Sequence, residues 1–214
     1  MEQPGIVLVT GATGGIGFQT ARELATRGWQ VVVSGRDLGR GNDAVQALRP
    51  EHGGLEVQLL VADLSTRAGV ASLAQQFRER YDHLDVLINL VMMAAMYEYA
   101  LRTSGTGVTV NVCYPGQAST AMTRSVTPGI LPRMMRPTFP LFKLFVRPDG
   151  GKSAAKASRS SVFLATSAEV SGVTGAYFDT NCARVEWPSA VLDDSVRKAT
   201  WDAVQLIAHG TGAS

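Results

Sequence analysis

The sequence predicts an α/β protein with one doubly wound parallel sheet, in which helices cover both faces of the strands. Short apolar runs alternate with segments of helix length along the N-terminal part of the chain, which is the pattern of repeated strand–helix units. The runs are rich in Val, Ile and Leu and show little polar alternation, as expected for strands buried on both faces. A glycine-rich stretch follows the first run and predicts a tight turn from strand to helix.

The predicted elements follow from this alternation in chain order. The apolar, β-branched runs predict strands over residues 6–10, 30–34, 56–62 and 85–89. The segments of helix length between them predict helices over 17–27, 38–48 and 66–81. A helix over 91–102, a strand over 108–113, a helix over 150–165, a strand over 176–179 and a helix over 192–207 complete the prediction.

The composition indicates one globular domain. The chain of 214 residues is long enough for a substantial core, and we treat residues 1–214 as a single domain. A hydrophobic content of 45% and a charged content of 18% are ordinary for such a domain. The net charge of +2, without a long run of like charges, argues against a nucleic-acid partner.

Neither a membrane span nor a leader is expected. The longest apolar stretch, 84–96, is interrupted by Asp85 and Asn89 and is too short to cross a bilayer. The first strand begins close to the N-terminus, which leaves no room for a signal peptide. Cys113 and Cys182 lack a Cys-x-x-Cys spacing and indicate reduced thiols in place of a disulfide or metal site. We therefore expect a cytoplasmic protein without a bound metal.

The glycine-rich stretch from Thr10 to Gly17 reads Thr-Gly-Ala-Thr-Gly-Gly-Ile-Gly. Gly11 permits the tight turn, Gly15 lets backbone N–H groups approach a phosphate, and Gly17 lets strand and helix pack closely. A pyrophosphate would then meet the N-terminus of the following helix. The sequence therefore predicts a dinucleotide-binding turn, with an ordinary tight loop as the alternative.

This spacing of glycines resembles the Thr-Gly-x-x-x-Gly-Ile-Gly turn of the short-chain dehydrogenase/reductase family. The resemblance implies a Rossmann-like fold and a nicotinamide dinucleotide cofactor. The predicted cofactor-binding residues of the turn are Gly11, Thr13, Gly14, Gly15, Ile16 and Gly17.

The end of the second strand indicates which cofactor is bound. The segment Val33-Ser-Gly-Arg36-Asp37 lies where a Rossmann-like fold binds the adenosine ribose. A carboxylate there accepts from a ribose 2′-hydroxyl, whereas a guanidinium pairs with a 2′-phosphate. Arg36 therefore favours NADP over NAD. The adjacent Asp37 has the opposite chemistry, and a plain solvated role for Arg36 stays open.

Two further segments resemble the cofactor site of the family. Asp63-Leu64 resembles its adenine-binding pair, in which the carboxylate accepts from the exocyclic amine and the leucine covers the ring; the alternative for Asp63 is a helix N-cap. Pro115-Gly116 with Thr120 resembles its Pro-Gly-x-x-x-Thr segment, in which the backbone turns beneath the nicotinamide and the threonine binds the carboxamide. An ordinary turn is the alternative for the second segment.

The resemblance breaks directly after Asn89. This residue matches the start of the family's Asn-Asn-Ala-Gly segment and is included as a cofactor contact, but the sequence continues with 90–102, which resembles the helix just beyond the family's catalytic lysine. A helix–strand unit with the catalytic Ser, Tyr and Lys is therefore absent. Tyr97, Tyr99 and Tyr177 offer no replacement, because each lacks the lysine four residues on that a tyrosine needs to act as an acid or base near neutral pH. We assign no catalytic residue.

Downstream segments resemble the retinol-dehydrogenase-like members of the family, which act on apolar carbonyls and alcohols. The matching segments are 147–151, 162–167, 172–178 and 201–202. The apolar, proline-rich stretch before them predicts a substrate lid over 123–149, with a loop packed on the core as an equal alternative. Dimers are common in the family, so a homo-oligomer is also an option.

Two functions follow, depending on the junction between Asn89 and Leu90. If the full protein contains a segment that this sequence omits, it is an NADP-dependent oxidoreductase that transfers a hydride between nicotinamide and a carbonyl or secondary alcohol of a small apolar substrate. If the chain is continuous there, it is a catalytically inactive NADP-binding or scaffold protein. We favour the first function, because loss of a strand from the middle of a sheet would expose or re-pair two central strands.

Overall fold

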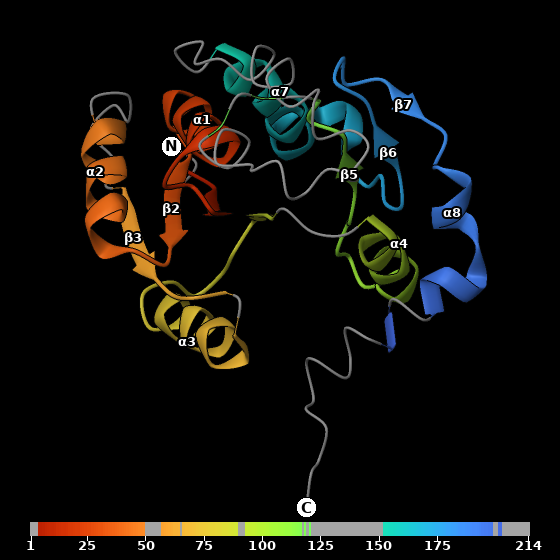
Figure 1. Cartoon of the computed structure of the whole chain (residues 1–214), viewed down its shortest axis with the longest axis horizontal. Helices are drawn as coiled ribbons and strands as arrows, with labels where there is room; N and C mark the ends of the chain where they lie inside the picture. Colours follow the sequence, from red (N-terminus) through yellow and green to blue (C-terminus); the bar gives the residue numbers. More distant parts are fainter. Residues whose placement is uncertain are drawn as a thin grey trace, which may run out of the picture.

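A computed structural model describes residues 4–49, 57–64, 66–89, 93–116, 118, 120, 152–198, 201 and 202. It confirms the α/β fold, with a parallel four-stranded sheet in the order β3-β2-β1-β4 (Figure 1). The strands are β1 (Ile6–Thr10), β2 (Gln30–Gly35), β3 (Gln58–Val61) and β4 (Val86–Ile88). The strand order places the carboxyl ends of β1, β2 and β4 along one edge, where ligands of such sheets bind.

Helices cover both faces of this sheet, as the apolar strands predict. The helices α1 (Gly15–Thr26) and α2 (Leu38–Leu48) pack on one face, and α3 (Arg67–Arg78) packs on the other. Side chains of one strand alternate between the two faces, so that Val7 and Val9 of β1 belong to the first core and Leu8 to the second. Every residue of β1 is buried.

A second, smaller sheet contains the C-terminal strands in the order β5-β6-β7. The strands are β5 (Val112–Cys113), β6 (Tyr177–Phe178) and β7 (Arg184–Val185); β6 pairs parallel with β5 and antiparallel with β7. The helix α7 (Lys152–Thr166) covers one face, where Phe163 contacts Phe178 with ring centroids 5.9 Å apart. The helix α4 (Met93–Arg102) and the short α8 (Ser189–Leu192) lie on the other face (Figure 1).

The helix α7 joins the two sheets into one body. It packs along α1, and small side chains at the contact, Ala154 and Ala157 on α7, allow the helices to approach closely. Val162 of α7 also belongs to the core that α1 and α2 form over the first sheet.

The two sheets are separated between β4 and β5, at the point where the sequence predicts a missing helix–strand unit. Within the described residues β4 pairs only with β1, and β5 pairs only with β6. Leu87 of β4 is 55% exposed, although it pairs with the buried Leu8 of β1. Strands of parallel sheets are normally covered on both faces, so β4 and β5 present edges that are atypical of this fold.

Two predicted elements are interrupted or shortened in the structure, and one strand was not predicted. The strand predicted over 108–113 is paired only at Val112–Cys113, because the Asn111 side chain bonds the Val173 carbonyl and the Ala176 N–H in place of a regular ladder. The helix predicted from residue 192 is interrupted at Asp193, whose carboxylate accepts hydrogen bonds from the Ser195 and Val196 N–H groups and begins a new helical segment over 194–198. The strand β7 was not predicted.

The lid predicted over 123–149 lies outside the described residues. Of the helices that the structure describes, none is long and apolar enough to span a membrane.

Candidate functional site

The turn after β1 has the backbone conformation that its glycines permit. Gly11 and Gly15 have φ angles of 65° and 60°, a region that favours glycine. A Cβ atom on Gly17 would lie 2.7 Å from the Gly11 carbonyl oxygen, so that any larger residue would separate the helix from the turn. The geometry accounts for the predicted turn at Gly11 and the predicted close packing at Gly17, whereas the approach of a phosphate to Gly15 stays a prediction.

The N-terminus of α1 is open for an anion. Gly14 is the N-cap residue, and no side chain of the described residues caps this helix. The first turn of α1 contains no acidic residue. The free N–H groups and the positive end of the helix dipole consequently face the edge where the strands end, as a pyrophosphate site requires. Ile16 anchors this turn by packing against Ala118, Ala154 and Ala157.

The second strand brings Arg36 to the same edge. Its neighbour Asp37 is the N-cap of α2 and accepts a 2.8 Å hydrogen bond from the Arg40 N–H. The carboxylate that would favour a ribose 2′-hydroxyl is therefore used by the helix. The Arg36 side chain is exposed and makes no hydrogen bond or ion pair within the described part of the chain.

Sequence reasoning missed a second cation at this place, Arg40. Its Nη2 atom lies 3.8 Å from the position of a Cβ on Gly14. Thr13, Gly14 and Arg40 line a cavity of about 360 Å³ between the starts of α1 and α2. The sequence could have indicated Arg40, because it lies in the first turn of the helix that follows Arg36 and its neighbour Asp37.

Asp63 and Leu64 follow β3 at the same edge of the sheet. Asp63 is exposed, and Leu64 is partly buried against the core that includes Leu60 and Leu73. The alternative role of Asp63 as an N-cap is wrong, because Thr66 caps α3 and accepts a 3.0 Å hydrogen bond from the Gly69 N–H.

Asn89 lies directly after β4 and is tied to β1. Its Oδ1 atom accepts a 2.9 Å hydrogen bond from the Thr10 hydroxyl, which also lies 3.2 Å from the Ile88 carbonyl. Thr10 is buried and precedes the glycine turn. The bond fixes the Asn89 side chain at the edge where the cofactor is predicted.

The Pro115-Gly116 segment reaches the glycine turn through Thr120. The Thr120 methyl group lies 3.1 Å from the position of a Cβ on Gly15, which brings the two predicted cofactor segments together. Gly116 has a φ of 76°, and a Cβ there would lie 2.8 Å from the Thr180 methyl group. The predicted cofactor residues thus follow the carboxyl ends of five strands: Gly11 after β1, Arg36 after β2, Asp63 after β3, Asn89 after β4 and Pro115 after β5.

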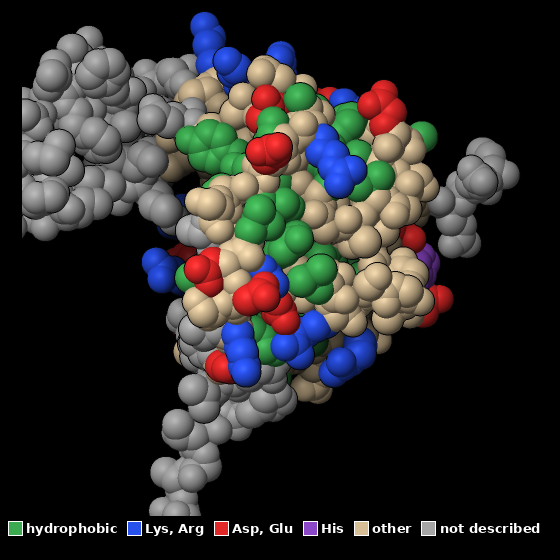
Figure 2. All heavy atoms as spheres, turned by 90° about the vertical axis from the view of Figure 1, so that its right-hand side faces the viewer, with side chains coloured by type: hydrophobic (Ala, Val, Ile, Leu, Met, Phe, Trp, Pro, Cys, Tyr) green, Lys and Arg blue, Asp and Glu red, His purple; other side chains and the backbone are tan. Residues whose placement is uncertain are grey.

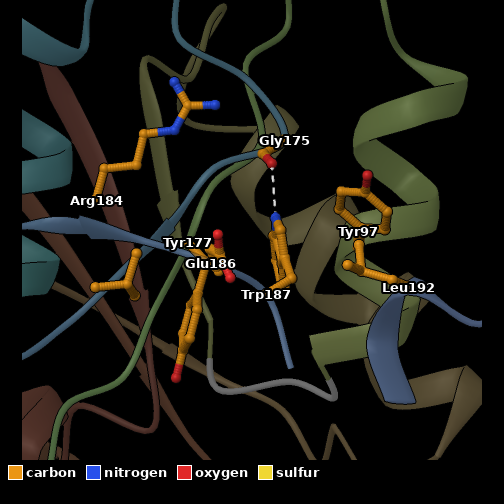
Figure 3. A pocket seen from close by; sticks show the side chains of 8 residues that line it. Tyr97, Gly175, Tyr177, Arg184, Glu186, Trp187 and Leu192 are labelled. Atoms are coloured by element: carbon orange, nitrogen blue, oxygen red, sulfur yellow. Dashed lines mark hydrogen bonds between the residues drawn. The ribbon is translucent and has the colours of Figure 1, made fainter. Parts of the chain in front are cut away.

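Tyr97 and Tyr177, which the sequence analysis considered as possible acids or bases, lie elsewhere. Tyr97 and Tyr177 flank Trp187 in a cavity of about 630 Å³ between α4, α8 and the β6–β7 pair (Figure 3). The Trp187 indole N–H donates to the Gly175 carbonyl at 2.9 Å, at the amino end of β6 and so opposite the cofactor edge. Burial raises the pKa of Tyr177 above its ordinary value, which works against its acting as a base.

The surface around this cavity is mixed in character. Figure 2 shows apolar side chains at the centre of this face, with basic (Lys or Arg) and acidic side chains around them. Val185 and Leu192 are among its exposed apolar residues. Tyr99 is also exposed and stacks on Trp201. None of these tyrosines is placed for proton transfer at the cofactor edge.

Comparison with known proteins shows sequence similarity to dehydrogenases. Residues 5–99 match the family model described as short chain dehydrogenase. Retinol dehydrogenase 14 of Mus musculus is 25% identical over 291 aligned positions, which cover 94% of this chain and 85% of the relative. Polyprenol dehydrogenase of Mus musculus is 43% identical over 88 residues, or 41% of this chain and 26% of the relative. The 291 positions exceed the 214 residues of the chain, so the alignment includes positions of the relative that have no counterpart here.

Solved structures show the same fold at low sequence identity. Actinorhodin polyketide ketoreductase with NADPH superimposes with a TM-score of 0.64 at 18% identity, covering 82% of this chain and 95% of that chain. L-Sorbose reductase from Gluconobacter frateurii, complexed with NADPH and L-sorbose, gives a TM-score of 0.61 at 14% identity, covering 88% and 100%. With the family model that matches residues 5–99 and the glycine turn, these similarities show that the chain resembles the short-chain dehydrogenase/reductase family and, among its members, retinol dehydrogenase 14.

Proposed function

We propose that the protein is an NADP-dependent oxidoreductase that transfers a hydride between nicotinamide and a carbonyl or secondary alcohol of a small apolar substrate. The bound cofactor would supply the hydride in carbonyl reduction or accept it in alcohol oxidation, and the protein would bind the cofactor and supply or accept the accompanying proton. The names of the relatives, retinol dehydrogenase 14 and polyprenol dehydrogenase, support an apolar alcohol or carbonyl as substrate.

The observation that carries the cofactor proposal is the convergence of anion-binding groups at one edge. The uncapped start of α1 lies beside the glycine turn, and Arg36 and Arg40 follow on the neighbouring strand and helix. Gly15 permits the positive φ of the turn, and Gly17 permits the close approach of α1 to Gly11, so that the helix N-terminus lies directly at the turn. With Asp37 engaged as a helix cap, the free guanidinium of Arg36 favours a 2′-phosphate and hence NADP.

We place the catalytic Ser, Tyr and Lys in a segment that the full protein has between Asn89 and Leu90. The unpaired edges of β4 and β5 support this, because one further helix–strand unit would fill the division between the sheets. The alignment that is longer than the chain supports it as well. The predicted dinucleotide contacts that follow β1, β2 and β3 lie outside that segment, so we expect them to bind the cofactor without it.

The alternative is a catalytically inactive NADP-binding or scaffold protein, if the chain is continuous at this junction. The observation that favours it is the N-terminal sheet, which forms without that segment, while Tyr97 and Tyr177 lie away from the predicted cofactor edge. In that case β4 and β5 keep exposed edges.

Intact mass spectrometry of the protein from its natural source separates the two. A species several kDa heavier than 22.8 kDa is expected for the oxidoreductase, and a species at 22.8 kDa would support the inactive binding protein. NADP affinity is expected in both cases. A single domain over 1–214, a cytoplasmic location and a homo-oligomer stay predictions of this proposal.

A further inference from the structure

The side chain of Thr13 lies directly against Gly35, the residue before Arg36. A Cβ built on Gly35 would lie 2.4 Å from the Thr13 methyl carbon and 3.5 Å from its hydroxyl oxygen. Thr13, a predicted cofactor residue of the glycine turn, is therefore in tight contact with the residue that precedes Arg36, the predicted cofactor residue after β2. No side chain larger than hydrogen fits at position 35 with Thr13 in this rotamer.

The backbone on both sides of the contact is held in place. The Ser34 carbonyl accepts a hydrogen bond of 3.3 Å from the Ala12 N–H, and the Gly35 carbonyl accepts one of 3.0 Å from the Ala62 N–H. Thr10 is the register partner of Ser34 in the β1–β2 pair. A clash at position 35 is consequently relieved most easily by the Thr13 side chain and not by a movement of either strand.

Thr13 has one rotatable side-chain bond and a β-branched carbon, so that it can move only by changing to another rotamer. Such a change moves the hydroxyl together with the methyl group. The absence of a side chain at position 35 thus permits the observed direction of the Thr13 hydroxyl, which a larger residue there would change.

We propose that Gly35 is a positioning residue that permits this Thr13 rotamer and thereby sets the affinity for the adenosine half of NADP. The contact between Thr13 and Gly35 sets the position of the glycine turn relative to Arg36, and both would bind the same ligand. This inference rests on the proposed function, because it concerns the site that binds the dinucleotide.

A double-mutant cycle tests the pair. Gly35→Ala, Thr13→Ser and the double variant are titrated calorimetrically with NADP⁺ and with 2′,5′-ADP, which carries the adenosine phosphates without nicotinamide. Gly35→Ala is expected to weaken both ligands by about tenfold, a coupling typical of side chains in contact. Serine lacks the methyl group that clashes, so the double variant is expected to bind within about threefold of Thr13→Ser alone.

Gly39→Ala is the matched control. A Cβ there meets Asp37 Oδ1 at 3.4 Å, an ordinary contact, and the residue lies in the first turn of α2 near the same site. Its affinity for both ligands is expected to equal that of the wild type. Urea unfolding of every variant verifies that the fold is retained.

The outcomes separate this inference from the proposed function. A wild-type protein that binds neither NADP⁺ nor 2′,5′-ADP would overturn both. Normal binding by the wild type together with normal binding by Gly35→Ala, or with a double variant as weak as Gly35→Ala, would overturn the positioning role and leave the proposed function intact.

Discussion

The N-terminal sheet β3-β2-β1-β4 and the C-terminal sheet β5-β6-β7 differ in strand length and burial, and we call the first the complete sheet. In the first, β1 is buried at every residue and pairs on both sides, with β2 and β4. In the second, the strands contain two residues each, and both residues of β7 are exposed. The difference is largest where the sheets should meet, at Leu87 of β4 and the start of β5.

The comparison separates cofactor binding from chemistry. The predicted nucleotide contacts at the ends of β1, β2 and β3 belong to the complete sheet, whose packing holds them in place. Proton transfer to the substrate belongs to the incomplete region, where the family's catalytic residues are absent from the sequence. Each half can therefore be tested independently of the other.

The largest effect is expected at the glycine turn of the complete sheet. Gly15→Val should reduce NADP affinity by about 100-fold or more, since it places a branched side chain where N–H groups meet the pyrophosphate. Gly172→Val is the control, because Gly172 also has a positive φ, 72°, but no atom within 4 Å of its added Cβ. Equal affinity of the two variants in calorimetry would contradict the phosphate-binding role of the turn.

The next effect compares two leucines of the same sheet. Leu60 of β3 is fully buried, whereas Leu87 of β4 is 55% exposed. Leu60→Ala should lower the free energy of unfolding by about 2–5 kcal/mol, and Leu87→Ala by less than about 1 kcal/mol, because only the first leaves a cavity. Urea unfolding of the 214-residue chain measures both. A cost at Leu87 as large as at Leu60 would show that β4 is covered.

A smaller effect sharpens the cofactor preference. Arg36→Asp should weaken NADP binding by roughly 1.5–3 kcal/mol, the range of a charge-assisted hydrogen bond, and change NAD binding little. Arg40→Gln, on the neighbouring helix, should act in the same direction with a smaller loss. Fluorescence titrations with both cofactors measure these changes, and equal losses for NADP and NAD would refute the assignment.

The smallest effect concerns the amino-terminal edge of the complete sheet, away from the cofactor. The hydrogen bond to Asp82 raises the pKa of His83 above its ordinary value of 6.5, and Asp85 adds to the increase. Since the folded pKa is the higher one, the stability from His83 is full below pH 6.5 and is lost as pH rises through the folded value. Urea midpoints should decline slightly over this window in the wild type, and His83→Gln should remove that decline.

The complete sheet was also the part that the sequence predicted best. β1 and α2 have the predicted bounds, because buried β-branched runs and helix-length segments depend on local composition. The short β5, by contrast, depends on Asn111 bonding a loop far away in the chain. Such long-range contacts leave no periodic pattern in the sequence.

The same distinction applies to the site. The glycine turn and Arg36 could be found from spacing and strand position, whereas the contacts of Arg40 with the turn and of Thr13 with Gly35 required the fold. The sequence left Asp63 open between an adenine contact and a helix N-cap, and it gave no helix-capping role to Asp37. The structure gives that role to Asp37 and to Thr66.

The most direct test of the separation between binding and chemistry is NADPH consumption by the 214-residue chain, with its mass confirmed at 22.8 kDa. The chain is mixed with NADPH and a panel of aldehydes and ketones at neutral pH. We expect NADPH to bind without carbonyl-dependent consumption, because the oxygen of the reduced carbonyl would find no tyrosine–lysine pair to give it a proton. Consumption that Gly15→Val abolishes, and that changes at Tyr97 and Tyr99 leave intact, would contradict this account.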